Sequence, residues 1–233
     1  MGHALRRAAS QRIGGFDPLT VGWTHAYWAE GPEFVALGKS DGASMTIWPD
    51  EMSTMDLETT AGTPTYQSSG WASPARPSVR FPGSALMVKG WSQSQPFSAV
   101  VIADRSGGGA FSYYIGGAGT SGWAIYRLGA STLSGFAGSD VTATADSDAP
   151  HMLALYANGG SSALGVDGTF TSGSAGSNNP TVLSLGGRSD GLAAVFFAGD
   201  IVFAGVASGD IRTDPKWSQF KTWVTSHYGI TVA

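Results

Sequence analysis

The sequence predicts an all-β sandwich with a short C-terminal α-helix. The chain has 233 residues, of which 34 are glycine, 13% are charged and 11% are aromatic. This composition is typical of a sheet protein with many turns. Between residues 97 and 208, short apolar runs alternate with glycine, asparagine and aspartate, as in antiparallel strands joined by tight turns. Apolar residues at helical spacing follow near the C-terminus.

Two apolar runs predict interior strands of the sandwich. Residues 97–103 are apolar on both faces apart from Ser98, which is typical of a strand covered on both sides. Residues 123–128 are similarly apolar, and we expect Arg127 to reach outward along its aliphatic stem.

Residues 151–156 form a later apolar run, in which alternate side chains should share a face. Met152, Ala154 and Tyr156 should lie on one face of a strand, with the leucines between them on the other. Residues 201–206 alternate in the same manner. With about five or six strands in each sheet, these runs predict a two-sheet sandwich of ordinary size.

A helix is predicted over residues 214–228. Pro215 stands where proline is favoured in a first turn, with Thr213 or Asp214 as the N-cap and Gly229 as the terminator. The side chains expected to form its apolar stripe are Trp217, Phe220, Val224 and either Trp223 or His227.

The first 15 residues are predicted to form a basic N-terminal arm. They contain Arg6, Arg7 and Arg12 and no acidic residue. Such an arm either frays as a free terminus or anchors the protein by ordering against a partner, and an exchange of arms between subunits stays open. Residues 16–233 are expected to form one sandwich domain, because all-β sandwiches commonly reach this length as a single domain.

The charge and hydropathy of the chain argue against several partners. The formal net charge of −4 gives no general attraction to nucleic acid or to an anionic membrane. No window approaches the roughly 18 consecutive apolar residues of a membrane-spanning helix, and the start lacks the apolar run of a secretion signal. The absence of cysteine excludes a disulfide framework and thiolate metal sites. We therefore expect no nucleic-acid partner, no membrane insertion and no signal-dependent secretion.

The order of four short motifs resembles a known family. The motif HMLALY begins at His151, VDG at Val166, LSLGG at Leu183 and FAGDI at Phe197. This succession resembles the concanavalin A-like, laminin-G-like jelly-roll family. The resemblance implies a concanavalin A-like jelly-roll β-sandwich. Members of this family mostly bind sugars, proteins or neighbouring subunits, and a minority are glycosidases.

Other motifs resemble the jelly-roll proteins of bacteriophage particles. The motif IWPD at Ile47 matches their turn motif well, whereas YWAE at Tyr27 matches loosely and HYGI at His227 resembles their final motif. Proline ends a strand ladder, and Asp50 can close a turn through its side chain. The resemblance implies a structural protein on the surface of a virion assembled in the host cytoplasm. Its partners would be other virion subunits and further copies of itself.

The carboxylates do not form the pattern of a glycosidase site. Such enzymes need two carboxylic acids that flank the scissile bond. The glutamates all precede residue 61 and none belongs to the acidic strand motif of glycosidases on this fold; they are Glu30, Glu33, Glu51 and Glu58. Aspartate pairs are the alternative, namely Asp146 with Asp148 or Asp190 with Asp200. No nucleophile elbow accompanies the histidines, and we expect a protein without enzymatic activity.

Binding residues are predicted in two groups. Exposed aromatic rings could stack on sugar faces, and the candidates are Trp71, Trp91, Tyr113, Tyr114 and Trp123; the alternative is that they lie in the core or in a subunit contact. No cofactor is expected, although calcium is the ion that suits the rims of related folds. Asp104 and Asp167 are its candidate ligands, with Asp167 also explained as a turn former.

Three functions are consistent with these observations. The first is a non-enzymatic bacteriophage structural protein, either a minor tail protein or a capsid decoration protein, that displays a lectin-like module and contributes its basic arm to attachment. The second is a carbohydrate-binding module for host or environmental glycans. The third, and least favoured, is a glycoside hydrolase.

Overall fold

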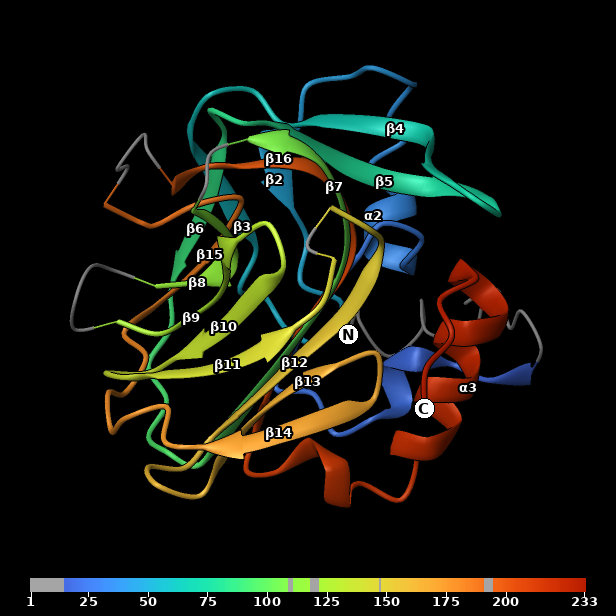
Figure 1. Cartoon of the computed structure of the whole chain (residues 1–233). Helices are drawn as coiled ribbons and strands as arrows, with labels where there is room; N and C mark the ends of the chain where they lie inside the picture. The colour runs from blue at the N-terminus through green and yellow to red at the C-terminus, as the bar shows by residue number, and fades with distance from the viewer. Residues whose placement is uncertain (1–14, 109–110, 118–121, 147, 191–194) are drawn as a thin grey trace.

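The protein is an all-β jelly-roll sandwich of two antiparallel sheets with one C-terminal helix (Figure 1). The computed structural model describes residues 15–108, 111–117, 122–146, 148–190 and 195–233. The predicted fold class is therefore confirmed. No helix in these ranges is both long enough and apolar enough to cross a membrane.

Sheet A has seven strands in its main path, and β1 (His25–Trp28) pairs with the second half of β16 (Phe197–Ser208). Neighbouring strands come from distant parts of the sequence, as jelly-roll connections require. The order across the sheet is β14 (Thr169–Gly173), β13 (Ser162–Val166), β12 (His151–Ala157), β7 (Phe97–Gly108), β16 (Phe197–Ser208), β5 (Ala75–Pro82) and β4 (Thr65–Ala72).

Sheet B has eight strands. Its order is β11 (Asp140–Thr144), β10 (Thr132–Phe136), β9 (Ala124–Gly129), β8 (Ser112–Gly116), β15 (Val182–Leu185), β6 (Leu86–Gly90), β3 (Leu57–Ala61) and β2 (Ile47–Trp48).

The main core lies between the two sheets. Period-two alternation directs Val101 and Leu153 of sheet A and Ile125 and Leu185 of sheet B into it, and all four are fully or almost fully buried. The rings of Trp91, Phe97 and Trp123 contact one another near one end of this core.

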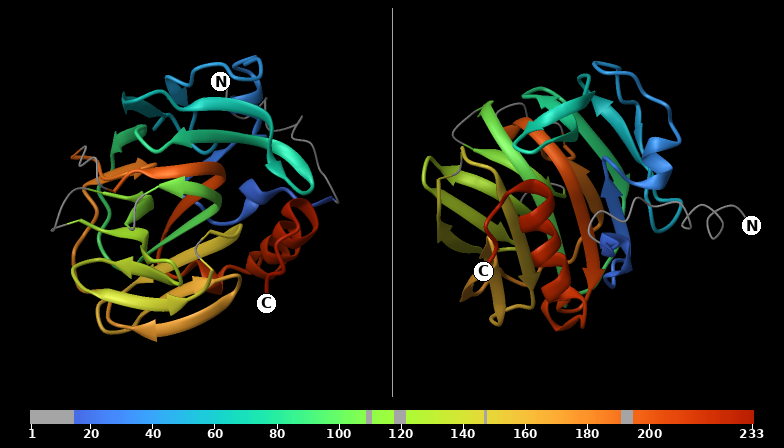
Figure 2. Two further views of the ribbon diagram at one scale, coloured as in Figure 1. Left: turned by 45° about the horizontal axis from the view of Figure 1, so that its top comes forward. Right: turned by 90° about the vertical axis from the view of Figure 1, so that its right-hand side faces the viewer.

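A second apolar cluster covers the outer face of sheet A. Val100, Ile102 and Met152 project from the face opposite to the main core and pack under α3 (Trp217–Tyr228) and under the segment around η3 (Pro18–Thr20). Figure 2 shows α3 lying across the strands of sheet A. Sheet A is therefore buried on both faces, which explains why residues 97–103 are apolar on both.

The sequence predicted most of these elements, with two differences. The helix begins at Trp217 rather than at residue 214, because the Asp214 carboxylate closes the preceding turn by accepting from the Lys216 amide. Its end is as predicted: Gly229 adopts φ 72° and its N–H bonds the Thr225 carbonyl. Arg127 was predicted to reach outward, and this is wrong: it projects between the sheets, is buried, and lies near Asp148.

Candidate functional site

Four of the five rings predicted to bind sugar are buried, so that prediction is wrong for them. Trp91 and Trp123 belong to the main core, and Tyr114 packs on Phe197 with ring centroids 5.0 Å apart. Trp71 lies under α3, where its indole N–H donates to the carbonyl of Tyr228. A ring enclosed by other side chains has no face to offer to a ligand.

Tyr113, the fifth ring, faces outward from sheet B. It is next to the buried Tyr114, so alternation along β8 places it on the opposite face. Tyr113 lies directly across from Tyr126 of β9, and the two rings stack with centroids 4.9 Å apart and an interplanar angle of 21°. Tyr126 thus supports the ring of Tyr113 from one side.

Phe111 extends this surface. It lies directly before β8, two residues from Tyr113, and 45% of it is exposed. Phe111 was not predicted from the sequence, although an aromatic residue two positions before Tyr113 was the available signal. We call Phe111, Tyr113 and Tyr126 the aromatic strip.

A carboxylate and a hydroxyl lie on one side of the aromatic strip. The Tyr126 hydroxyl donates to Asp140 Oδ1 over 2.7 Å, and Ser134 Oγ donates to the same oxygen over 2.5 Å. Burial and the hydrogen bond to Asp140 both raise the pKa of Tyr126 well above its usual value. The phenol therefore keeps its proton, while Asp140 stays at the surface as an acceptor.

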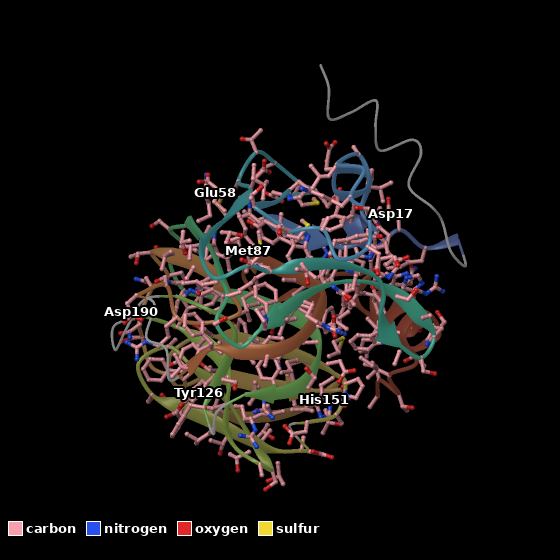
Figure 3. The ribbon with its side chains drawn as sticks, turned by 90° about the horizontal axis from the view of Figure 1, so that it is seen from above. Asp17, Glu58, Met87, Tyr126, His151 and Asp190 are labelled. Atoms are coloured by element: carbon pink, nitrogen blue, oxygen red, sulfur yellow. The ribbon has the colours of Figure 1, made fainter. Side chains whose placement is uncertain are left out.

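Arg188 and Asp190 carry further charge near Tyr113. The Arg188 guanidinium lies 2.5 Å from Asp190 Oδ2. Burial raises the pKa of Tyr113; Arg188 opposes this shift, whereas Asp140 and Asp190 add to it, so all three charges act on this ring. Figure 3 shows Tyr126 and Asp190 toward the same side of the molecule.

The two predicted calcium ligands are not brought together in a metal site. Asp167 uses both carboxylate oxygens within the protein: Oδ2 is 2.7 Å from His151 Nδ1, and Oδ1 accepts from the Met152 amide over 2.9 Å. Asp104 lies opposite Asp200 in the register of β7 and β16. Across the ranges that the structure describes, no three histidine, aspartate or glutamate side chains form a metal-binding group.

The aspartate pairs considered for hydrolysis have other partners. Asp200 accepts from Ser78 and Arg80 on the outer face of sheet A, whereas Asp190 pairs with Arg188. Asp146 accepts from the Asp148 amide in a turn, and Asp148 pairs with Arg105. Each of these carboxylates is explained by a turn or an ion pair.

His25, Asp50 and Ser53 also meet, in an arrangement unlike a catalytic triad. Asp50 Oδ2 and Ser53 Oγ lie 2.7 and 3.2 Å from the same His25 nitrogen, Nδ1. A triad needs the acid and the nucleophile on opposite ring nitrogens. Asp50 also accepts from the Met52 amide, which confirms its predicted role in closing the turn.

Arg6, Arg7 and Arg12 of the basic arm lie outside the described residues. The described chain begins beside α3, where Gly15 and Phe16 border a groove of about 390 Å³. The helix side of this groove is formed by Ser218, Gln219, Thr222, Trp223 and Ser226.

No protein-family model matches the chain. No curated protein sequence matches it either.

Several solved structures are similar in fold. Trypanosoma rangeli sialidase in complex with sialic acid aligns over 92% of this chain and 34% of its own, with a TM-score of 0.58 and 12% identity. A mutant of the same sialidase displaying trans-sialidase activity aligns over 99% and 38%, with a TM-score of 0.59 and 10% identity. The chain thus spans about a third of the length of these sialidases.

A third structure matches at nearly its full length. Domain 4 of AbnA, an extracellular arabinanase from Geobacillus stearothermophilus solved in complex with arabinotriose, aligns over 78% of this chain and 98% of its own. The TM-score is 0.53 and the identity is 12%. Together with the two-sheet topology, these similarities show that the chain has the concanavalin A-like jelly-roll fold.

Proposed function

We propose that this protein is a non-enzymatic, lectin-like module that binds glycans through the aromatic strip. The exposed ring of Phe111 and the half-buried ring of Tyr113 carry this proposal, because apolar sugar faces stack on such rings. The flanking Asp140, Arg188 and Asp190 supply acceptors and donors for sugar hydroxyl groups.

The architecture supports this choice of surface. The outer face of sheet A is largely covered by α3 and the N-terminal segment, whereas the aromatic strip lies on the outer face of sheet B. The arabinotriose bound to domain 4 of AbnA gives a precedent for an oligosaccharide on this fold.

Glycan binding by the purified protein tests the proposal. A panel of neutral and acidic oligosaccharides identifies a ligand, and calorimetry then compares Phe111→Ala and Tyr113→Ala with the parent protein. Loss of one stacked ring should weaken binding by about tenfold or more. Ile47→Ala is the matched control, because Ile47 is 42% exposed on sheet B, outside the aromatic strip. Equal affinities in all four proteins, or no binding across the panel, contradict the proposal.

We further propose that this protein is a minor tail protein or a capsid decoration protein, which displays the module on a bacteriophage particle. The IWPD motif at Ile47 supports this through its resemblance to virion proteins, and its buried Trp48 and turn-closing Asp50 fit that motif's expected role. Electron microscopy of purified particles should find symmetric copies in contact with head or tail subunits. Recovery of the protein only outside particles would contradict the virion role and leave the glycan-binding proposal in place.

A further inference from the structure

The four sheet edges differ in how they are protected. The edge of β4 is covered by residues 42–45, since the Gly42 amide donates to the Tyr66 carbonyl and the Tyr66 amide donates to the Ala43 carbonyl. The edge strand β2 has two residues, which is too short to template a partner strand. The edges at β14 and β11 remain, and they lie on the same side of the sandwich.

The β14 edge carries no charged side chain that would block pairing with another chain. Residues 168–187 include no charged side chain. Thr169, Thr171 and Ser172 of β14 are exposed, and in the part of the chain that the structure describes, the strand pairs with β13 alone. Exposed edges in monomeric proteins usually carry lysine, proline or a bulge that blocks pairing with another chain. The β11 edge carries such a charge, because Asp140 is exposed at its start.

We propose that β14 is a self-association surface, on which a second copy of this chain pairs through the same strand. The copies run antiparallel about a two-fold axis at Thr171, as expected for an isologous interface. Thr171 then faces its own copy, Phe170 faces Ser172, and Thr169 faces Gly173. Threonine pairs and aromatic side chains are favourable cross-strand neighbours, and no like charges meet.

The groove beside β14 agrees with this arrangement. Thr169 and Thr171 line a groove of about 450 Å³, together with Ala143 and Ala145 from the β11 side. A second β14 laid along this edge covers the mouth of the groove. The added contact removes the methyl groups of these threonines and alanines from water, beyond what strand pairing alone contributes.

Charge variants at Thr171 test the proposal in the full chain. We expect the parent protein to form dimers in analytical ultracentrifugation. Thr171→Lys and Thr171→Glu should each weaken the dimer by about tenfold or more, because like charges then face each other. An equimolar mixture of the two variants should restore dimers, because the facing charges become opposite. This restoration also shows that both variants are folded.

A matched control distinguishes pairing through the β14 edge from pairing through the β11 edge. Thr142→Lys places the same charge at an exposed site on β11 that does not line this groove, and it should leave the dimer unchanged. A parent protein that stays monomeric at high concentration overturns the proposal. It is equally overturned if Thr142→Lys dissociates the dimer while Thr171→Lys does not, or if the mixture of Thr171 variants fails to associate.

Discussion

The imidazole of His151 joins two turns through Asp167 and the backbone of residue 146. Nδ1 lies 2.7 Å from Asp167 Oδ2, and Nε2 lies 2.6 Å from the carbonyl oxygen of Asp146. A carbonyl and a carboxylate both accept hydrogen bonds, so both ring nitrogens carry protons in this arrangement. Burial lowers the pKa of His151, but the bonds to Asp167 and Asp146 outweigh it and raise the pKa above 6.5.

Stability should therefore fall as the pH rises through the pKa of His151. A raised folded-state pKa gives a contribution that is complete below the unfolded value and lost above the folded one. His151→Gln should lose about 1–3 kcal/mol of the free energy of unfolding in acid, and the loss should shrink at alkaline pH. Urea denaturation of both proteins across pH 5.5 to about 8.5 measures this. Burial also raises the pKa of Glu51 to about 7, so the difference between the two proteins isolates His151. A loss independent of pH would contradict the assigned protonation.

The ion pair of Asp200 should matter more than an exposed pair of the same length. Asp200 is 3% exposed, accepts from Ser78 Oγ over 2.6 Å and lies 2.7 Å from Arg80. Asp200→Ala leaves these partners unsatisfied and should cost about 2–4 kcal/mol. Glu58→Ala is the control: its carboxylate, also 2.7 Å from a cation, is 59% exposed, and its loss should cost less than about 1 kcal/mol. Equal losses in chemical denaturation would show that burial does not strengthen the Asp200 pair.

Trp123 should affect stability rather than glycan binding. Its ring contacts Trp91 and Phe97 in the main core, and its indole N–H donates to the Val182 carbonyl over 3.0 Å. Trp123→Ala should cost about 3–5 kcal/mol, and Trp123→Phe should fold with unchanged glycan affinity. Thermal unfolding and calorimetry measure the two effects. Weaker glycan binding by a stable Trp123→Phe protein would place this ring in the site after all.

Calcium should leave the protein unchanged. Both carboxylate oxygens of Asp167 already accept from His151 and Met152, and a cation would have to displace those bonds. We expect the melting temperature to shift by less than about 1 °C between excess chelator and millimolar calcium. A rise of several degrees with calcium, absent with magnesium, would indicate a site that the apo arrangement conceals.

Local patterns explain what the sequence could predict. Residues 97–103 and 151–156 show their strands as short apolar runs, and residues 217–229 show a helix through spacing and a terminal glycine. These signals depend on near neighbours in the chain. Even there, the helix start was misplaced by three residues, since Asp214 caps a turn before the helix instead of the helix itself.

The candidate site depends on long-range register, which the sequence does not reveal. Tyr113 and Tyr114 have similar side chains, and only the pairing of β8 with β9 decides that Tyr113 faces out. Trp71 is buried because α3, more than 140 residues later, covers it. Asp104 and Asp200 are neighbours solely through the β7–β16 pairing. Aromatic residue type therefore indicated binding at several positions where the ring belongs to the core.

The packing of α3 on sheet A also fixes the direction from which the protein can be held. Gly15 borders α3, and the terminal Ala233 contacts Lys221 of the same helix. A tether or affinity tag joined to Ala233 therefore leaves from the helix-covered side of the sandwich. The aromatic strip lies on the other side, so immobilisation through Ala233 should present it to the surrounding solution.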